Sequence, residues 1–174
     1  QREVRFDTAD FQVALHACFR EDMDIILIGE MRGLDTIATA VTAAETGHMV
    51  YSTLHTNNAA QTIDRIIDSF PSEQQDQIRV QLSGSLAGIF SQRLIPNISG
   101  GQVPAYELLI NNSAVANLIR ERRTHEIPMV IETGSELGMI DMNRSLAELV
   151  RAGEITAENA YLHSFNPKAL ERLI

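Results

Sequence analysis

Two kinds of apolar pattern alternate along the first two thirds of the chain. Residues 25–29 are a continuous, mainly β-branched apolar run, which is typical of a strand buried on both faces of a parallel sheet. Residues 48–54 predict a second buried strand. A third strand is predicted at 103–110, after a loop at 97–101 that contains Asn, Ser and two Gly residues.

Apolar residues at helical spacing predict helices between these strands. The first helix is expected to start at Asp7-Thr8, the second to cover 34–46 and end before Gly47, and the third to cover 57–68. A turn at 70–72 precedes a long predicted helix. Its apolar stripe is formed by Ile78, Leu82, Leu86, Ile89 and Phe90.

The order of strands and helices predicts an α/β fold with a partly parallel sheet flanked by helices. After Asn111 the pattern becomes helical throughout. Helices are expected at 113–121, 126–133, 141–152 and 157–162, and Asn166-Pro167 starts a last one. We therefore expect an α/β part at 1–111, followed by a small helical C-terminal region at 112–174.

Composition narrows the class of protein. The 174 residues are 44% hydrophobic and 21% charged, as in one globular unit. The chain has 23 acidic and 14 basic residues. The resulting net charge of −9 argues against a surface built to bind nucleic acid. A single cysteine excludes an internal disulfide and fits a reducing compartment. The apolar runs are too short to span a bilayer. Because the chain begins with Gln rather than Met, we expect it to be part of a longer protein.

Glu30 directly follows the first predicted strand. Open α/β sheets bind ligands at the carboxyl ends of their strands. An acid there can hold Mg²⁺, directly or through water, or orient an attacking water. An apolar strand that ends in a carboxylate is the arrangement of the Walker B segment of P-loop ATPases. The alternative is an ordinary strand whose first loop residue is a surface glutamate.

Two histidines flank the second predicted strand. A strand of this length places His48 and His55 roughly 20 Å apart at ~3.3 Å per residue, so they cannot share a metal ion within one chain. One cysteine cannot build a Cys-rich zinc site either. His55, with Thr53 and Thr56 beside it, is placed to donate a hydrogen bond to a γ-phosphate oxygen. The alternative is a histidine that caps a turn.

The glycine-rich phosphate-binding loop is missing from this sequence. No G-x-x-x-x-G-K-[ST] segment occurs in the chain, and no serine lies in a nucleophile-elbow pattern. One histidine contact cannot replace a loop of backbone N–H groups that surrounds the phosphates. We therefore expect residues 1–174 by themselves to bind and hydrolyse ATP poorly.

Taken together, these segments resemble the secretion ATPase superfamily, and within it the type IV pilus retraction ATPases. Residues 20–32, with Gly-Glu-Met-Arg near their end, resemble the Walker B segment of the family, and residues 42–56 resemble its His box. Residues 114–121 resemble the AIRNLIRE motif that is associated with retraction. Residues 60–71 and 133–142 also fit. Several separate motifs in the order of the family make the resemblance specific.

The resemblance implies a RecA-like subunit of a cytoplasmic homo-hexamer that hydrolyses ATP with Mg²⁺ and drives pilin subunits out of a pilus. Such a motor works against an inner-membrane platform protein of the pilus, without membrane insertion and without nucleic acid. Full-length members carry an N-terminal domain, a Walker A segment and an acidic box before Walker B. The chain is therefore expected to be the C-terminal part of such a protein.

The resemblance also assigns roles to individual residues. It makes Glu30 and His55 catalytic, with Glu30 holding Mg²⁺ through water. Neighbours of the nucleotide and the Mg²⁺ would be Gly29, Arg32, Glu45, His48 and Thr53. A motor-coupling motif would comprise Ala114, Asn117, Leu118, Ile119, Arg120 and Glu121.

The chain departs from the family pattern at four positions. Met23 replaces a usual Pro, Gly33 a usual Asp, and Val115 and Ala116 differ from the motif, so the role of the motif arginine at Ala116 does not carry over. Two alternatives stay open. One is a non-catalytic assembly or regulatory module of the same fold. The other is an extension or secretion ATPase, since Gln92-Arg93-Leu94 also occurs in such relatives.

Overall fold

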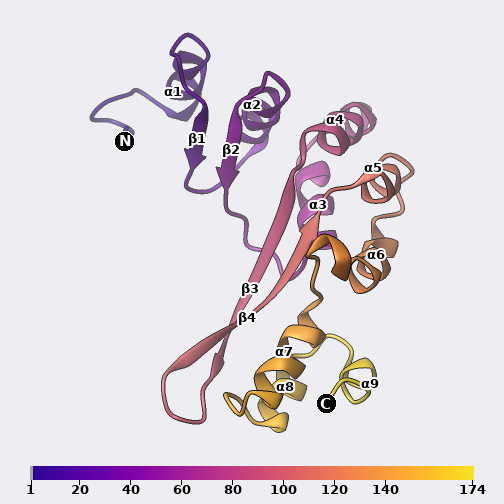
Figure 1. Ribbon diagram of the computed structural model, residues 1–174. Coiled ribbons are helices and arrows are strands. Elements are labelled where there is room, and N and C mark those ends of the chain that lie inside the picture. Colours follow the sequence, from indigo (N-terminus) through magenta and orange to yellow (C-terminus); the bar gives the residue numbers. More distant parts are fainter. Residues whose placement is uncertain (1) are drawn as a thin grey trace.

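Two parallel strands form the first part of the fold. In the computed structural model, which describes residues 2–174, β1 (Ile25–Ile28) pairs in parallel with β2 (Met49–Ser52) (Figure 1). α1 (Phe11–Cys18) precedes β1, and α2 (Leu34–Glu45) connects the two strands. α1 starts after Asp10, whose side chain accepts a hydrogen bond from the N–H of Val13, and so it begins later than predicted. The parallel pairing and the α/β class are confirmed.

One face of this small sheet is covered by the described residues, and the other is exposed. Ile26 and Ile28 are buried against α1 and α2. The side chains on the opposite face are exposed, and they are Ile25, Leu27, Met49 and Tyr51. The prediction of two strands buried on both faces is therefore wrong for this part of the chain. Side chains alternate along a strand, and the two helices pack on the same face.

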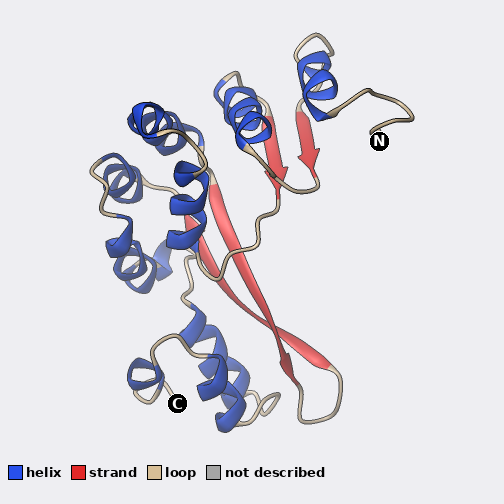
Figure 2. Ribbon diagram, turned by 180° about the vertical axis from the view of Figure 1, so that it is seen from behind, coloured by secondary structure: helices blue, strands red, loops and turns tan. Residues whose placement is uncertain are grey.

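The remaining helices of the fold pack along a long antiparallel hairpin. β3 (Gly88–Pro96) pairs with β4 (Gln102–Ile110), with Gly88 opposite Ile110 and Pro96 opposite Gln102. Figure 2 shows this hairpin reaching from one group of helices to another. The loop at 97–101 and the strand near 103–110 are confirmed. The predicted helix through Ile89 and Phe90 is wrong, because α4 (Ser72–Ser85) ends before them and both residues lie in β3.

The end of α4 depends on a contact far along the chain. The side-chain amide of Asn111 donates hydrogen bonds to the carbonyl oxygens of Ser83, at 3.1 Å, and Leu86, at 2.8 Å. These bonds satisfy carbonyl groups that a helix end leaves without partners. β3 then starts at Gly88, where the strands approach so closely that a Cβ atom would lie 2.7 Å from the carbonyl oxygen of Leu109.

The two glycines on either side of this helix end give a direct test. Replacing Gly88 by Ala is expected to lower the free energy of unfolding by about 1–3 kcal/mol, because the new methyl group meets backbone that must shift. Gly84 lies within α4 and has open space around it, so Gly84→Ala is expected to raise stability by about 0.5–1 kcal/mol. Urea denaturation of both variants measures the difference. Equal effects of the same sign would contradict the close approach at Gly88.

Two hydrophobic cores lie along the hairpin. The first joins α2, α4 and one end of the hairpin to α3 (Ala59–Asp68), α5 (Ser113–Arg120) and α6 (Ile127–Thr133). Its fully buried side chains include Ile63, Ile67, Leu109, Ile119 and Ile127. The helices α5 and α6 of the C-terminal region therefore pack on the α/β part.

The second core lies at the other end of the hairpin (Figure 1). It contains α7 (Met142–Arg151), α8 (Ala157–His163) and α9 (Pro167–Leu170), which pack on Ile95 and Ala105. Two short 3₁₀ helices, η1 (Thr124–Glu126) and η2 (Ser135–Leu137), complete the connections. The predicted helices of the C-terminal region are confirmed. Over residues 2–174, every helix is too short or too polar to cross a membrane.

Candidate functional site

The carboxyl ends of β1 and β2 bring together the residues that follow the two strands. The hydroxyl group of Thr53 donates a hydrogen bond to the carbonyl oxygen of Gly29 at 2.6 Å. The N–H of Met31 donates to the carbonyl oxygen of Thr53 at 3.2 Å. These bonds continue the parallel pairing beyond the strands and hold the two loops side by side. They place Glu30 on one loop and His55 on the other at the same edge of the sheet.

Glu30 lies between two basic side chains. Its Oε2 atom lies 2.8 Å from Nη2 of Arg32, and its Oε1 atom lies 3.3 Å from Nε2 of His55. The Glu30 side chain is 28% exposed, while the side chains of Arg32 and His55 are 79% and 78% exposed. The carboxylate is thus partly sheltered, and its two partners reach it from the solvent side.

Electrostatics keeps the Glu30 carboxyl group ionised. The hydrogen bond from Arg32 is the main cause of a lowered pKa of Glu30, and the positive charge of Arg32 and the proximity of His55 act in the same direction. The same contact raises the pKa of Arg32. A hydrogen on Nε2 of His55 lets the imidazole donate toward the carboxylate. The edge therefore presents an anionic oxygen pair beside an N–H donor.

This donor set fits part of a magnesium–nucleotide site. Mg²⁺ prefers oxygen ligands, keeps several waters and often binds through one or two carboxylates together with substrate phosphates. The ionised Glu30 carboxylate matches that preference as a single protein ligand or as an acceptor for a metal-bound water. Between Arg2 and Ile174, the structure holds no cluster of three or more acidic, His or Cys side chains that could enclose a metal without a phosphate. Glu30 could thus hold Mg²⁺ only together with other oxygens.

Glu45 and His48 lie at the opposite end of the strands. The Oε2 atom of Glu45 accepts a hydrogen bond from the side-chain amide of Gln81 at 2.7 Å. The His48 ring contacts Phe19 edge to face, with 5.7 Å between ring centroids, and its Nδ1 atom lies 3.2 Å from the carbonyl oxygen of Ala43. Since β2 starts at residue 49, parallel pairing places these residues at the amino edge of the sheet. The structure does not bring them to Glu30.

The predicted motor-coupling motif forms α5, and its residues divide between two environments. Leu118 and Ile119 are buried in the first core. Ala114, Asn117 and Glu121 are exposed. Arg120 also serves the fold, because it donates to the hydroxyl group of Ser83 on α4 at 3.1 Å and to Asn117 at 2.7 Å.

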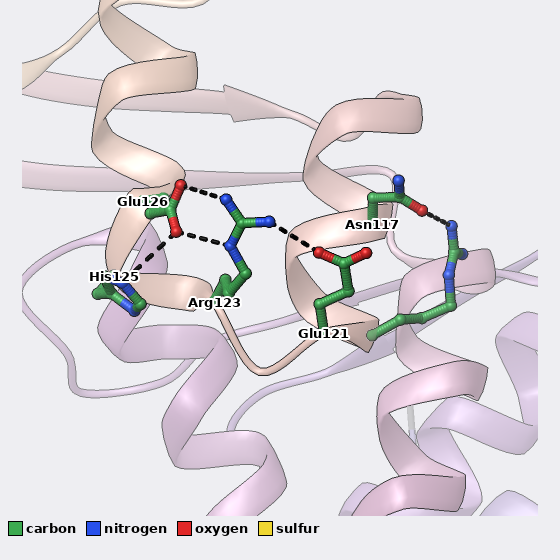
Figure 3. Close-up of polar contacts among 6 residues, drawn as sticks. Asn117, Glu121, Arg123, His125 and Glu126 are labelled. Carbon is green, nitrogen blue, oxygen red and sulfur yellow. Dashed lines mark hydrogen bonds and ion pairs between the residues drawn. The ribbon is translucent and has the colours of Figure 1, made fainter.

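A groove of about 410 Å³ runs between α5 and α6. Arg123 is one of its lining residues and donates to Glu121 at 2.9 Å and to both carboxylate oxygens of Glu126 at 2.6 and 2.8 Å (Figure 3). Hydrogen bonding from Arg123 lowers the pKa of Glu126. Leu118 and Met129 supply apolar surface to the groove. Figure 3 also shows Asn117 bonded to the neighbouring arginine.

Sequence reasoning did not find the residues that α6 and the preceding turn contribute to this groove. Arg123 and Glu126 are three residues apart, a spacing that permits an ion pair on one helical face and was the available signal. The further contact of Arg123 with Glu121 is seen only in the structure. We refer below to the α5–α6 groove, which is lined by Ala114, Asn117, Leu118, Glu121, Arg123, Glu126, Met129, Val130 and Thr133.

The chain is similar to known proteins over nearly its whole length. The chain is 51% identical over 160 residues to the type IV pilus retraction ATPase PilT of Pseudomonas aeruginosa, covering 92% of this chain and 46% of that protein. It is 47% identical over 171 residues to a twitching motility protein of Neisseria gonorrhoeae, covering 98% of this chain and 46% of that protein. A crystal structure of the pilus retraction motor PilT with bound ADP superposes with a TM-score of 0.89 at 52% identity, over 99% of this chain and 48% of that one.

These relatives are about twice as long as the matched region, so the chain spans about half of their length. The superposition shows that the α/β arrangement described above is the fold of the corresponding half of a solved pilus motor. Residues 5–122 match the family described as Type II/IV secretion system protein. That match covers both strand ends with Glu30 and His55, as well as α5. The chain belongs to the Type II/IV secretion system protein family.

Proposed function

We propose that this chain is part of a type IV pilus retraction ATPase, in which Glu30 and His55 act on ATP. The observation that carries the proposal is the contact of an ionised Glu30 with His55 at the carboxyl ends of two parallel strands. The same chain is about half identical in sequence to PilT over most of its length. A site of this kind, in a chain this similar to a retraction ATPase, favours the same chemistry.

Within this proposal, Glu30 would help to hold Mg²⁺ through a water, or would accept a hydrogen bond from a water positioned for attack. A bound Mg²⁺ ion supplies neutralisation of the phosphate charge that develops during transfer. When phosphate binds, the Nε2–H of His55 would turn from the Glu30 carboxylate to a γ-phosphate oxygen, and exposed Arg32 adds positive charge at the same edge. Gly29 and Thr53 keep the two loops in register through the hydroxyl–carbonyl bond.

The remaining parts of the site would come from outside residues 1–174. Phosphate affinity in such motors depends on a glycine-rich loop at a helix N-terminus, and this sequence has none. We propose that the protein works as a cytoplasmic homo-hexamer that is peripheral to the inner-membrane pilus platform protein. The identity to PilT supports this assembly, and the net charge of −9 supports a partner other than nucleic acid.

We propose that α3 couples the sheet edge with Glu30 and His55 to the helices of the α5–α6 groove. α3 begins four residues after His55 and packs in the first core with α5 and α6. At its far side, the hydroxyl group of Thr124 in η1 donates to Asp64 of α3 at 2.8 Å. A shift of the His55 loop would therefore move α3 against η1 and against the core that it shares with α5 and α6. We propose that the exposed side chains of α5 contact the pilus platform protein.

A gene deletion tests the direction of the motor. If the protein retracts pili, a deletion strain keeps surface pili but loses twitching, because pili still assemble and are not withdrawn. If it extends pili, the deletion strain has no surface pili, and if it drives secretion, pili and twitching remain while an exported protein is lost. Electron microscopy and twitching-zone measurements distinguish these results. Restoration of twitching by the wild-type gene, and not by its Glu30→Gln form, would tie the phenotype to the proposed site.

A further inference from the structure

A polar pair lies at the junction of the two hydrophobic cores. Arg93 of β3 and Glu107 of β4 lie on the same face of the hairpin, since Arg93 pairs with Ala105 and Glu107 pairs with Ser91. This is the covered face, on which Ala105 and Ser91 are also buried. Glu107 is only 7% exposed. A buried carboxylate is costly unless it has a bonding partner, so its position calls for a physical reason.

Both side chains bind the segment that follows His55. Nη2 of Arg93 donates a hydrogen bond to the side-chain oxygen of Asn57 at 3.1 Å. Oε1 of Glu107 accepts one from the backbone N–H of Ala59, the first residue of α3, at 2.8 Å. An acidic group at a helix N-terminus is also favoured by the helix dipole. The hairpin thus anchors the loop after His55 at two points, two and four residues away from the histidine.

The C-terminal helices reach the same place through an aromatic ring. The guanidinium carbon of Arg93 lies 4.3 Å from the centroid of the Phe165 ring, within the range of a cation–π contact. Phe165 lies between α8 and α9. Its neighbours are fixed to α7, because the hydroxyl group of Ser164 donates to Oδ1 of Asn143 at 2.6 Å and Nδ2 of Asn143 donates to the carbonyl oxygen of Asn166 at 3.0 Å. The residues on either side of Phe165 in the chain are therefore fixed to α7.

We propose that Arg93 and Glu107 are positioning residues for His55, and that the C-terminal helices α7–α9 act on the candidate site through the contact of Phe165 with Arg93. The part that concerns catalysis rests on the function proposed above. Arg93 is the shared element, since one side chain contacts both the His55 loop and the C-terminal helices. Removal of the ring should therefore loosen a loop that is about one hundred residues earlier in the sequence.

Amide hydrogen exchange on the protein at its natural length tests the positioning directly. Arg93→Ala is expected to increase exchange in the segment 55–61 about 10-fold, and Phe165→Leu about 3-fold, because local opening becomes easier where an anchor is lost. Exchange in α4 should stay unchanged. The matched control is Gln92→Ala, on the exposed face of β3, which should leave the loop as in the wild type. Wild-type exchange in 55–61 of the Arg93 variant would overturn the proposal.

The double variant tests whether Phe165 acts through Arg93. If it does, Arg93→Ala with Phe165→Leu exchanges no faster in 55–61 than Arg93→Ala alone, whereas independent effects multiply. Glu107→Gln keeps an oxygen that can accept from Ala59 and should preserve loop protection, while Glu107→Ala should lose it. If Glu107→Ala fails to fold, the half-buried Arg93 and exposed Phe165 variants still decide the question. If the effects of Arg93→Ala and Phe165→Leu on exchange multiply in the double variant, the route through Arg93 is refuted.

Steady-state kinetics separates this inference from the proposed function. Arg93→Ala is expected to lower kcat for ATP about 10-fold while KM changes less than about twofold, because a misplaced group costs turnover more than binding. If Arg93→Ala lowers kcat/KM only by raising KM, that result would contradict a role of Arg93 in positioning His55. If the wild-type protein hydrolyses no ATP, the proposed function fails. The exchange measurements still decide whether the hairpin and Phe165 hold the loop.

Discussion

Replacing Glu30 by Gln is expected to lower ATP turnover about 100-fold or more while nucleotide binding survives. Gln keeps the shape of the side chain but removes the negative charge that attracts Mg²⁺ or a proton of a positioned water. A 100-fold loss corresponds to about 2.7 kcal/mol of transition-state stabilisation, which one charged group in a partly sheltered site can supply. Phosphate release by the protein at its natural length measures turnover, and titration with MgATP measures binding.

A surface glutamate provides the control for this variant. Glu158 is exposed in the first turn of α8, a helix that lies far from β1 and β2 in Figure 1, so Glu158→Gln should hydrolyse ATP like the wild type. The pH profile gives a second check. Because Arg32 lowers the pKa of Glu30, activity that depends on the ionised carboxylate should fall only below the ordinary pKa of a glutamate. Near-normal turnover by Glu30→Gln would refute the catalytic assignment.

Replacing Ala114 by Arg is expected to abolish twitching. Ala114 is exposed on α5 and lines the α5–α6 groove, so a long cationic side chain would fill the groove without entering the core. Filling a groove blocks any partner side chain that must enter it. Twitching zones of the variant strain measure the effect. Ala114→Ser adds one oxygen atom to the same site and should twitch like the wild type.

Protein level and thermal stability must accompany the Ala114 experiment. A variant that is absent from the cell or melts early would lose twitching for a trivial reason, so immunoblots and melting curves of both variants belong to the measurement. A folded Ala114→Arg protein that supports wild-type twitching would show that this groove does not bind the platform protein. In that case the exposed side of α5 has no role in coupling.

Local patterns were sufficient for much of the fold. The run at 25–29, the helix signal at 57–68 and the C-terminal helix starts all correspond to elements in the structure. Asn58, Asn112 and Asp141 each cap a helix by accepting a backbone hydrogen bond, and such caps are readable because they act over three residues. These predictions succeeded where the determining interaction lies within one or two helical turns.

The predictions that failed depended on contacts between distant segments. The spacing of apolar residues predicted that the helix α4 continues through Ile89. In the structure the side-chain amide of Asn111 bonds to the end of the helix, and Gly88 allows the neighbouring strand to approach closely. The apolar run at 25–29 suggested burial on both faces, yet α1 and α2 cover one of them. Hydrophobic content does not indicate how many faces of a strand are covered, since that depends on which elements pack against it.

The sequence by itself determined that Glu30 and His55 follow two strands of an α/β fold, because a strand end is encoded by the residues beside it. Parallel pairing alone could place both at one edge, and only the tertiary structure decided that their side chains lie 3.3 Å apart. It likewise decided that Arg93 reaches both Asn57 and Phe165. Such contacts depend on how far helices and the hairpin bring separate segments together, and no local pattern carries that information.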